Sequence, residues 1–289
     1  MRFDSYHPII NFMYFIVVIT CTVCFTHPVF LVLAYLAAFL WSVKLNGRRA
    51  LVFNLCLIPC LLLYVIWYSS YHHFGVTNLW QNKIGNWITL ESILVGTVCG
   101  IKTITVCMEF SCVFATVTSD KMVYLLGRIS PNLSLFLSII LRSIPRIKKQ
   151  MKKIDVAREG VGRGIRQGNP FQRIWHGIVQ VSIIVTWGIE HLIMSAASMK
   201  SRGYSLRGRT AFSIYRFDDR DRVLVVVIFF CAMQMHLADL AGKTQMLYDP
   251  VILWNPIDGW AVLSYVIYGV LLFLPLGLQL IGEYRFSDL

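Results

Sequence analysis

Long apolar stretches separated by short polar segments make up most of this sequence. Six of them are close to the roughly 20 residues that an α-helix needs to cross the hydrocarbon core of a bilayer. They cover residues 9–26, 28–43, 50–68, 92–118, 223–240 and 260–282. The pattern predicts an all-α, multi-pass membrane protein, in which the first stretch is a retained span because no small-residue cleavage site follows it.

Two further apolar stretches, 122–141 and 178–198, are interrupted by polar residues. Arg128 and the Ser130-Pro131-Asn132 segment break the first, and a glutamine, a glutamate and a histidine lie in the second. If both crossed the membrane, the basic run from Arg142 to Lys153 would face outward, against the cytoplasmic bias of Lys and Arg. We therefore expect both stretches to lie on or near the cytoplasmic side.

The same bias gives the expected orientation. Lys44, Arg48 and Arg49 place the turn after the second span inside, so that about six spans leave both termini in the cytoplasm. The chain then divides into three parts. These are N-terminal transmembrane helices (1–118), a cytoplasmic helical coupling module (119–222) and C-terminal transmembrane helices (223–289).

Composition agrees with a membrane location and draws attention to the module. Hydrophobic residues make up 56% of the 289 residues and charged residues only 15%, whereas soluble domains have about 25% charged residues. With a mean hydropathy of +0.62, this composition excludes a water-soluble fold. Residues 119–222 contain 19 Lys and Arg against 7 Asp and Glu, so this module alone accounts for the formal net charge of +12.

Few residues outside the module suggest chemistry. The eight cysteines all lie in apolar runs, where free thiols behave as small hydrophobic residues. We therefore expect no disulfide framework, and no redox or metal site at Cys21-x-x-Cys24. His72 and His73 lack carboxylate or thiol partners at metal-ligand spacing.

Lys102 and Glu109 are ionisable residues inside the fourth span, seven residues apart. Such residues are candidates for function or for mutual pairing, but seven residues is about 10 Å along a helix, too far for a direct ion pair. We expect each to meet a neighbouring helix or to snorkel. No nucleophilic triad or carboxylate pair stands out, so we expect a non-catalytic chain with no cofactor or metal.

Two Arg–Gly clusters follow helical segments of the module, at residues 157–164 and 198–205. One interpretation is that they are helix C-caps beside anionic lipid headgroups, since glycine ends helices and arginine complements the helix dipole. The other is that each presents an arginine to a groove on a partner protein. A phosphate loop is disfavoured, because neither a preceding strand nor a Gly-Lys-Ser/Thr ending is present. Nucleic acid is disfavoured too, because apolar residues alternate with the basic ones, as in helices lying on a bilayer.

Several motifs of the module and its surroundings are typical of one family. They are residues 118–126, 131–135, 141–146, 198–204 and 208–212, together with Tyr6-His7-Pro8 and the stretch from Thr186 to Glu190. In these motifs, which extend over most of the chain, the sequence resembles the transmembrane T component of energy-coupling factor (ECF) transporters, the EcfT/CbiQ family.

The resemblance implies a multi-pass scaffold in a prokaryotic cell membrane. It would couple ATP hydrolysis by two ABC ATPase subunits to the uptake of a vitamin or a transition-metal ion (cobalt or nickel), which a separate S component binds. In this family two helices of the module each end in an Arg-centred motif that docks in one ATPase. Ser201-Arg202-Gly203 matches the second motif. For the first, Ala157-Arg158-Glu159 has Glu where a small residue is usual, and Arg163 between two glycines is the alternative.

The implied mechanism is mechanical: closure of the ATPase dimer moves the docked helix ends, and the module tips the S component. The apolar residues expected to seat the S component are Ile183, Ile184, Trp187, Leu192 and Ile193. Two other classes stay open. One is a membrane enzyme acting on lipid phosphates, for which only Asp155 and Glu159 lie near the arginines, and the other is a passive basic anchor that binds anionic lipid.

Overall fold

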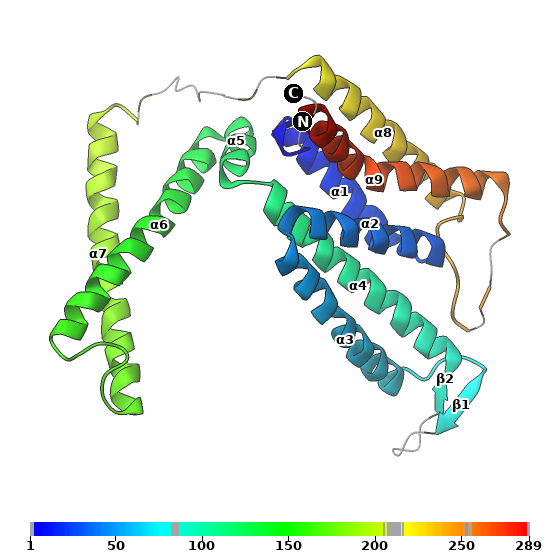
Figure 1. The fold of residues 1–289 in the computed structure, drawn as a ribbon, viewed down its shortest axis with the longest axis horizontal. Coiled ribbons are helices and arrows are strands. Elements are labelled where there is room, and N and C mark those ends of the chain that lie inside the picture. Colours follow the sequence, from blue (N-terminus) through cyan, green and yellow to red (C-terminus); the bar gives the residue numbers. More distant parts are fainter. Residues whose placement is uncertain are drawn as a thin grey trace. The chain divides into compact units, whose positions relative to one another are not determined.

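The computed structural model describes residues 3–81, 87–204, 206, 215, 217–250, 252–253 and 256–287. The chain forms two compact units, of which unit 1 is Met1–Thr118 with Tyr215–Leu289, and unit 2 is Ser119–Ile214. Nearly all the regular structure in the described residues is helical (Figure 1). The prediction of an all-α, multi-pass architecture is confirmed, because six helices within these described ranges are long and apolar enough to cross a membrane.

Unit 1 combines the two transmembrane segments expected from the sequence. Its helices are α1 (Pro8–Cys24), α2 (Pro28–Asn46), α3 (Arg48–Tyr71), α4 (Leu90–Thr116), α8 (Asp219–Leu240) and α9 (Gly259–Ser287). A 3₁₀ turn η1 (Phe3–Ser5) precedes them, and a hairpin of β1 (Asn78–Gln81) and β2 (Trp87–Thr89) joins α3 to α4. Unit 2 contains α5 (Ser119–Ile129), α6 (Pro131–Gly160) and α7 (Pro170–Ser201). The border expected after Arg222 falls inside α8.

Each predicted span forms a helix, but the six helices that meet the criteria of length and composition are not the predicted six. They are α2, α3, α4, α7, α8 and α9. Helix α1 has only 17 residues, about 26 Å of helix, which is slightly less than the hydrocarbon core. Helix α7 meets these criteria, although its stretch 178–198 was not among the spans predicted from the sequence. The stretch 122–141 is divided between α5 and α6 at Ser130.

Two helices of unit 1 begin at a His-Pro pair. Proline suits the first helical position because its φ is already helical and it has no N–H to satisfy. The imidazole before it caps the helix, since Nδ1 of His7 accepts the N–H of Ile9 at 3.3 Å and Nδ1 of His27 accepts that of Val29 at 3.4 Å. Both caps need a neutral imidazole.

We expect acid to weaken the cap at His27. Burial lowers the pKa of His27 below its usual value near 6.5. Since the folded protein holds the neutral form more strongly, the contribution of His27 to stability is present above about pH 6.5 and is lost as the pH falls through the lowered pKa. His27→Asn keeps a capping acceptor that does not titrate. Melting temperatures between pH 7.5 and 5.5 should therefore fall more steeply for wild type than for His27→Asn, and equal slopes would contradict this assignment.

Helix α4 lies against α1, α2 and α3, and its contact with α3 depends on two glycines one turn apart. A Cβ at Gly96 would lie 3.1 Å from Cδ1 of Tyr68, and one at Gly100 would lie 3.3 Å from Cδ1 of Tyr64. This is the small-xxx-small spacing that lets membrane helices approach closely. The tyrosines of α3 therefore fill the groove that the glycines leave.

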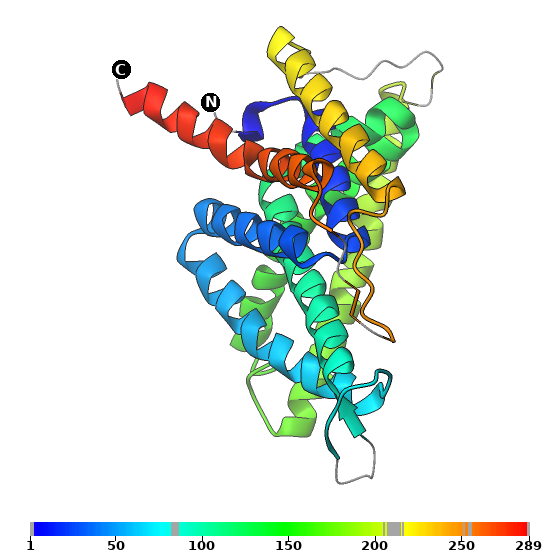
Figure 2. The same ribbon diagram turned by 90° about the vertical axis from the view of Figure 1, so that its right-hand side faces the viewer.

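The β1–β2 hairpin is a feature that the sequence analysis did not predict, and it lies at the end of the α3–α4 pair (Figure 2). Glu91, in the first turn of α4, holds the preceding loop by accepting hydrogen bonds from the backbone N–H and the hydroxyl of Thr77. Trp80 and Trp87 of the hairpin are 59% and 49% exposed. Exposed tryptophans at the end of apolar helices are typical of a membrane–water interface.

The first and last described residues of the chain both lie at the end of unit 1 that is opposite the hairpin. The ring of Phe3 packs on Trp41 near the end of α2, with centroids 5.6 Å apart, and Lys44 forms a 2.7 Å ion pair with Glu283 near the end of α9. The N–H of His7 donates to Asp221 in the first turn of α8 at 3.4 Å. Thr116, the last residue of α4, lines a cavity with Phe3, Lys44 and Glu283. The chain thus leaves unit 1 after α4 and re-enters it at α8 on the side of the basic α2–α3 turn.

Candidate functional site

The first Arg–Gly cluster forms the end of α6. Arg158 and Glu159 lie in the last turn, and the N–H groups of Gly162 and Arg163 donate to the carbonyls of Glu159 and Arg158 at 3.0 and 2.9 Å. Gly162 has a φ of +73°, the left-handed conformation that favours glycine. The arrangement is a Schellman cap, which satisfies carbonyls that the helix end leaves free.

The two arginines of this cluster are used differently. The Arg158 side chain is half-buried and folds back over the cap, so that its Nε and Nη2 donate to the carbonyl of Arg163 at 3.3 and 3.2 Å. Ala157, Glu159 and Arg163 are exposed, and within the described part of the chain the Arg163 guanidinium has no partner. Arg158 therefore stabilises the turn, and Arg163 is the arginine that the turn presents.

The second cluster ends α7 with the same cap. The N–H groups of Gly203 and Tyr204 donate to the carbonyls of Lys200 and Met199 at 3.1 and 3.2 Å, and Gly203 has a φ of +79°. The Ser201 hydroxyl donates to the carbonyl of Ser198 at 2.8 Å. Arg202 is exposed, and no described residue pairs with its guanidinium. The final residue of the cluster, Ser205, and the 208–212 motif lie outside the described residues.

The two ends share a cap but differ in where they place the arginine. Aligned on the left-handed glycines Gly162 and Gly203, Arg202 corresponds to Val161, and Arg163 follows its glycine instead of preceding it. The sequence alone left this open, because any of three glycines between 160 and 164 could have ended α6. Helices α6 and α7 run in opposite directions (Figure 1), so the two arginines lie at opposite ends of a helical hairpin whose arms are roughly 45 Å long.

Helix α7 uses one face for α6. Gln180 is buried on this face, and the Trp187 ring stacks on His191 with centroids 5.3 Å apart and an angle of 3°. Nη1 of Arg146 on α6 lies 2.9 Å from Nε2 of His191. Of the residues expected to seat a partner, Trp187 and Ile184 are thus half-buried on the inner face, whereas Ile183, Leu192 and Ile193 are exposed. These five residues do not form one surface.

The opposite face of α7 carries a continuous apolar stripe that was not predicted from the sequence. Its residues follow the three-and-four spacing of one helix face and are between 49% and 83% exposed. They are Phe171, Ile174, Ile178, Val181, Val185, Ile189 and Leu192. The periodicity could have identified it from the sequence, whereas the identity of the inner face depends on α6.

Helix α6 is amphipathic. Its apolar stripe consists of Leu133, Phe136, Ile140, Ile144, Ile147 and Met151, all exposed by 37% or more. About half a turn away runs a basic row of Arg142, Arg146, Lys149 and Lys153. Helix α6 therefore has an apolar face and a basic face on opposite sides, a pattern that suits a bilayer surface or a membrane-protein partner.

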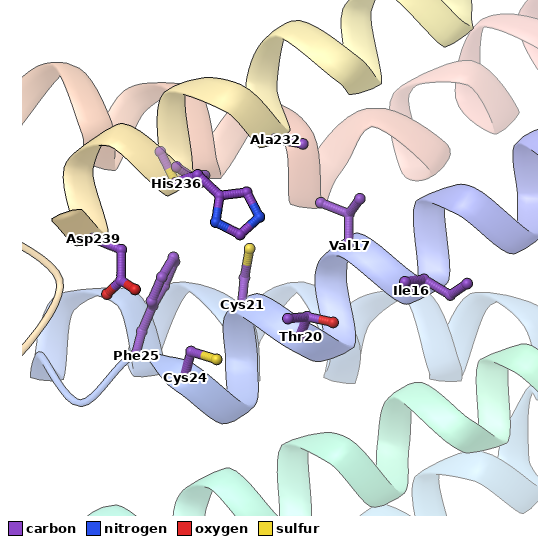
Figure 3. Close-up of a pocket in the computed structure, with 10 residues that line it drawn as sticks. Ile16, Val17, Thr20, Cys21, Cys24, Phe25, Ala232, His236 and Asp239 are labelled. Carbon is purple, nitrogen blue, oxygen red and sulfur yellow. The ribbon is translucent and has the colours of Figure 1, made fainter.

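A separate pocket lies in unit 1 between α1 and α8, with a volume of about 130 Å³. Figure 3 shows the Cys21 sulfur turned toward the His236 ring, whereas Cys24 points away and Asp239 lies toward the other end. Both thiols are free. No three His, Cys, Asp or Glu side chains among the described residues are placed to hold a metal ion.

The ionisable pair inside α4 behaves as expected, since each member meets α1. Nζ of Lys102 donates to the carbonyl of Val23 at 2.9 Å, and Oε1 of Glu109 lies 2.8 Å from the Thr22 hydroxyl. At the end of α3, His72 stacks on Tyr68 with centroids 4.2 Å apart. When the chain is compared with models of known protein families and with curated protein sequences, it matches neither.

Proposed function

We propose that this chain is the transmembrane scaffold of an ECF-type importer, a non-catalytic subunit that couples ATP hydrolysis by two ABC ATPases to substrate uptake through a separate S component. The observation that carries the proposal is the pair of exposed arginines, Arg163 and Arg202, at the glycine-capped ends of two long helices in unit 2. The resemblance of the sequence motifs to the EcfT/CbiQ family supports the same function.

An exposed arginine on a capped helix end is well suited to docking. Its guanidinium donates several hydrogen bonds in a fixed plane and is always charged. The caps at Gly162 and Gly203 already satisfy backbone carbonyls at each helix end. Because these ends are ordered before binding, docking would cost little conformational entropy. Arginines of this kind are frequent hot spots of protein interfaces.

The separation of the two arginines suits two partner subunits. Each end of the α6–α7 hairpin would dock on one ATPase, so that closure of the ATPase dimer on ATP binding would move both ends of unit 2. His191 of α7, whose ring stacks on Trp187 of the same helix, contacts Arg146 of α6 and so joins the arms near their middle. A joined pair of helices can transmit such a displacement as one body.

The exposed stripes of α6 and α7 would seat the S component and contact lipid. The cargo, a vitamin or a transition-metal ion, would be bound by the S component. We place the chain in a prokaryotic cell membrane with both termini in the cytoplasm. Support for this side comes from Lys44, Arg48 and Arg49, which lie at the same end of unit 1 as Phe3 and Glu283.

The proposal is tested by purifying the tagged chain from its native membranes in mild detergent. We expect two ABC ATPase chains and one small membrane protein to co-purify, as identified by mass spectrometry, and the eluate to hydrolyse ATP. A chain that elutes alone, and that stimulates no ATPase when candidate subunits are added, would overturn the proposal.

The first docking arginine is tested by Arg163→Ala and Arg158→Ala side by side. We expect Arg163→Ala to lower the ATPase content of the purified complex toward one copy and to leave the turn intact. Arg158→Ala removes two hydrogen bonds within the turn, each with a net value of about 1 kcal/mol, so it should raise protease cleavage between residues 161 and 169 and have the smaller effect on ATPase content. Loss of one ATPase with Arg158→Ala alone would reverse the assignment.

A further inference from the structure

Helix α4 contains two buried glutamates whose surroundings are opposite in kind. Glu91 and Glu109 are 3% and 4% exposed. Around Glu91 the groups are donors, because the N–H of Thr77 lies 3.3 Å from both carboxylate oxygens and the Thr77 hydroxyl donates to Oε2 at 2.7 Å. Hydrogen bonds donated to a carboxyl group stabilise its ionised form. The surroundings of Glu91 thus favour its ionised form.

Around Glu109 the described hydrogen-bond donors are too few to stabilise a carboxylate. The Thr22 hydroxyl lies 2.8 Å from Oε1 of Glu109, 3.0 Å from the carbonyl of Val18 and 3.4 Å from the hydroxyl of Tyr268. A threonine hydroxyl has one hydrogen to donate and two lone pairs to accept with. Its single hydrogen can go to Oε1 of Glu109 or to the Val18 carbonyl, so among the described residues Glu109 receives at most this one hydrogen bond, whereas two donors of Thr77 serve Glu91.

Among the described residues, no positive charge that would compensate an ionised carboxylate interacts with Glu109. The titratable groups that interact with it are Tyr14 and Cys21 on α1, Cys112 on α4 and Tyr268 on α9, and none of them is a cation. The Tyr14 hydroxyl donates to the carbonyl of Leu272 at 3.2 Å. An unpaired charge in such surroundings has a large desolvation penalty.

The second oxygen of Glu109 leads to the same conclusion. Oε2 is buried and has no hydrogen-bond partner in the described part of the structure, and the same is true of the indole N–H of Trp41. Both residues line one small cavity between α1, α2, α4 and α9. A carbonyl oxygen tolerates this position better than a carboxylate oxygen, because it carries less charge to solvate.

We infer that Glu109 is a proton-binding site within the transmembrane bundle. The hydrogen bond between its carboxyl group and the Thr22 hydroxyl joins α4 to α1, and the contact of Thr22 with Tyr268 extends this connection to α9. This inference goes beyond the proposed function and does not depend on it, since it concerns the membrane bundle of unit 1 alone.

Infrared difference spectroscopy of the purified chain in lipid nanodiscs tests this assignment. A protonated carboxyl group has a carbonyl band at higher frequency than the amide bands, and a carboxylate has none there. Near neutral pH, wild type minus Glu109→Gln should show the band of one carboxylic acid. Wild type minus Glu91→Gln, the matched control on the same helix, should show carboxylate bands only. A difference for Glu109→Gln that contains only carboxylate bands would overturn the inference.

The amide of Glu109→Gln can both accept from and donate to the Thr22 hydroxyl, so we expect this variant to fold. If it does not assemble, wild-type protein with ¹³C in its glutamate side chains decides the question. Isotope substitution lowers the frequency of any acid band that arises from glutamate. Such a shifted band supports a protonated buried glutamate, and its absence at neutral pH contradicts one.

Discussion

Arg202→Ala should lower ATP-driven uptake at least tenfold while the chain still inserts in the membrane. Arg202 is exposed at the capped end of α7, and no described residue pairs with its guanidinium, so its removal costs the folded chain little. A hot-spot arginine contributes about 2 kcal/mol or more to an interface, which is roughly a thirtyfold change in affinity. Uptake by vesicles and the ATPase content of the purified complex would measure the effect.

Two further variants distinguish docking from simple attraction to lipid. Arg202→Lys keeps the charge but loses the planar fork, so it should remain impaired if the arginine docks in a protein groove and should be normal if it only attracts anionic headgroups. Lys148→Ala removes an exposed cation of the same unit that lies neither at a helix end nor in the basic row of α6, and it should leave uptake unchanged. Normal uptake by Arg202→Ala would remove Arg202 from the mechanism.

Valine at Gly96 and Gly100 should separate α3 from α4 and destabilise unit 1. The added atoms would meet Tyr68 at 3.1 Å, and Tyr64 and Leu61 at 3.3 and 3.5 Å. The rings have little room to move, because Tyr68 is stacked on His72 and lies 6.0 Å from Tyr64. Overpacking of this kind costs about 1–3 kcal/mol at each site, and neighbouring sites need not add.

Gly269→Val is the matched control for this pair. Gly269 also lies in an apolar membrane helix, but a Cβ there meets nothing within 4 Å. The melting temperature of the detergent-solubilised protein, followed by size-exclusion chromatography, should fall for Gly96→Val and Gly100→Val, and more for the double variant, with little change for Gly269→Val. Equal melting temperatures for all four variants would show that the tyrosines move aside without cost.

The helices were predictable from the sequence because each long apolar stretch has only one way to satisfy its backbone in lipid. The hairpin at residues 78–89 was missed, since strands of four and three residues carry little periodicity. The number of long apolar helices was predicted correctly, but one member of the set was exchanged, because α1 ends at Cys24, two residues before Thr26 donates to Thr244, and is short, whereas α7 is long and apolar.

The candidate docking site was predictable only in outline. Glycine and arginine in sequence indicated two helix ends, and both ends exist with glycine in the left-handed conformation. Which arginine is presented depended on the Arg158 side chain, whose partner is a backbone carbonyl five residues away. Such a bond follows from the path of the turn and has no signature in composition.

The insertion of unit 2 between α4 and α8 has a mechanical consequence. Because the chain leaves and re-enters unit 1 at the same end, any pull on these two connections acts on α4 and α8 together, and between those helices lies α1, which contacts both. Helix α1 would then be the pivot about which α4 and α8 move. The load would fall on its contacts with α4, where Thr22 and Val23 meet Glu109 and Lys102.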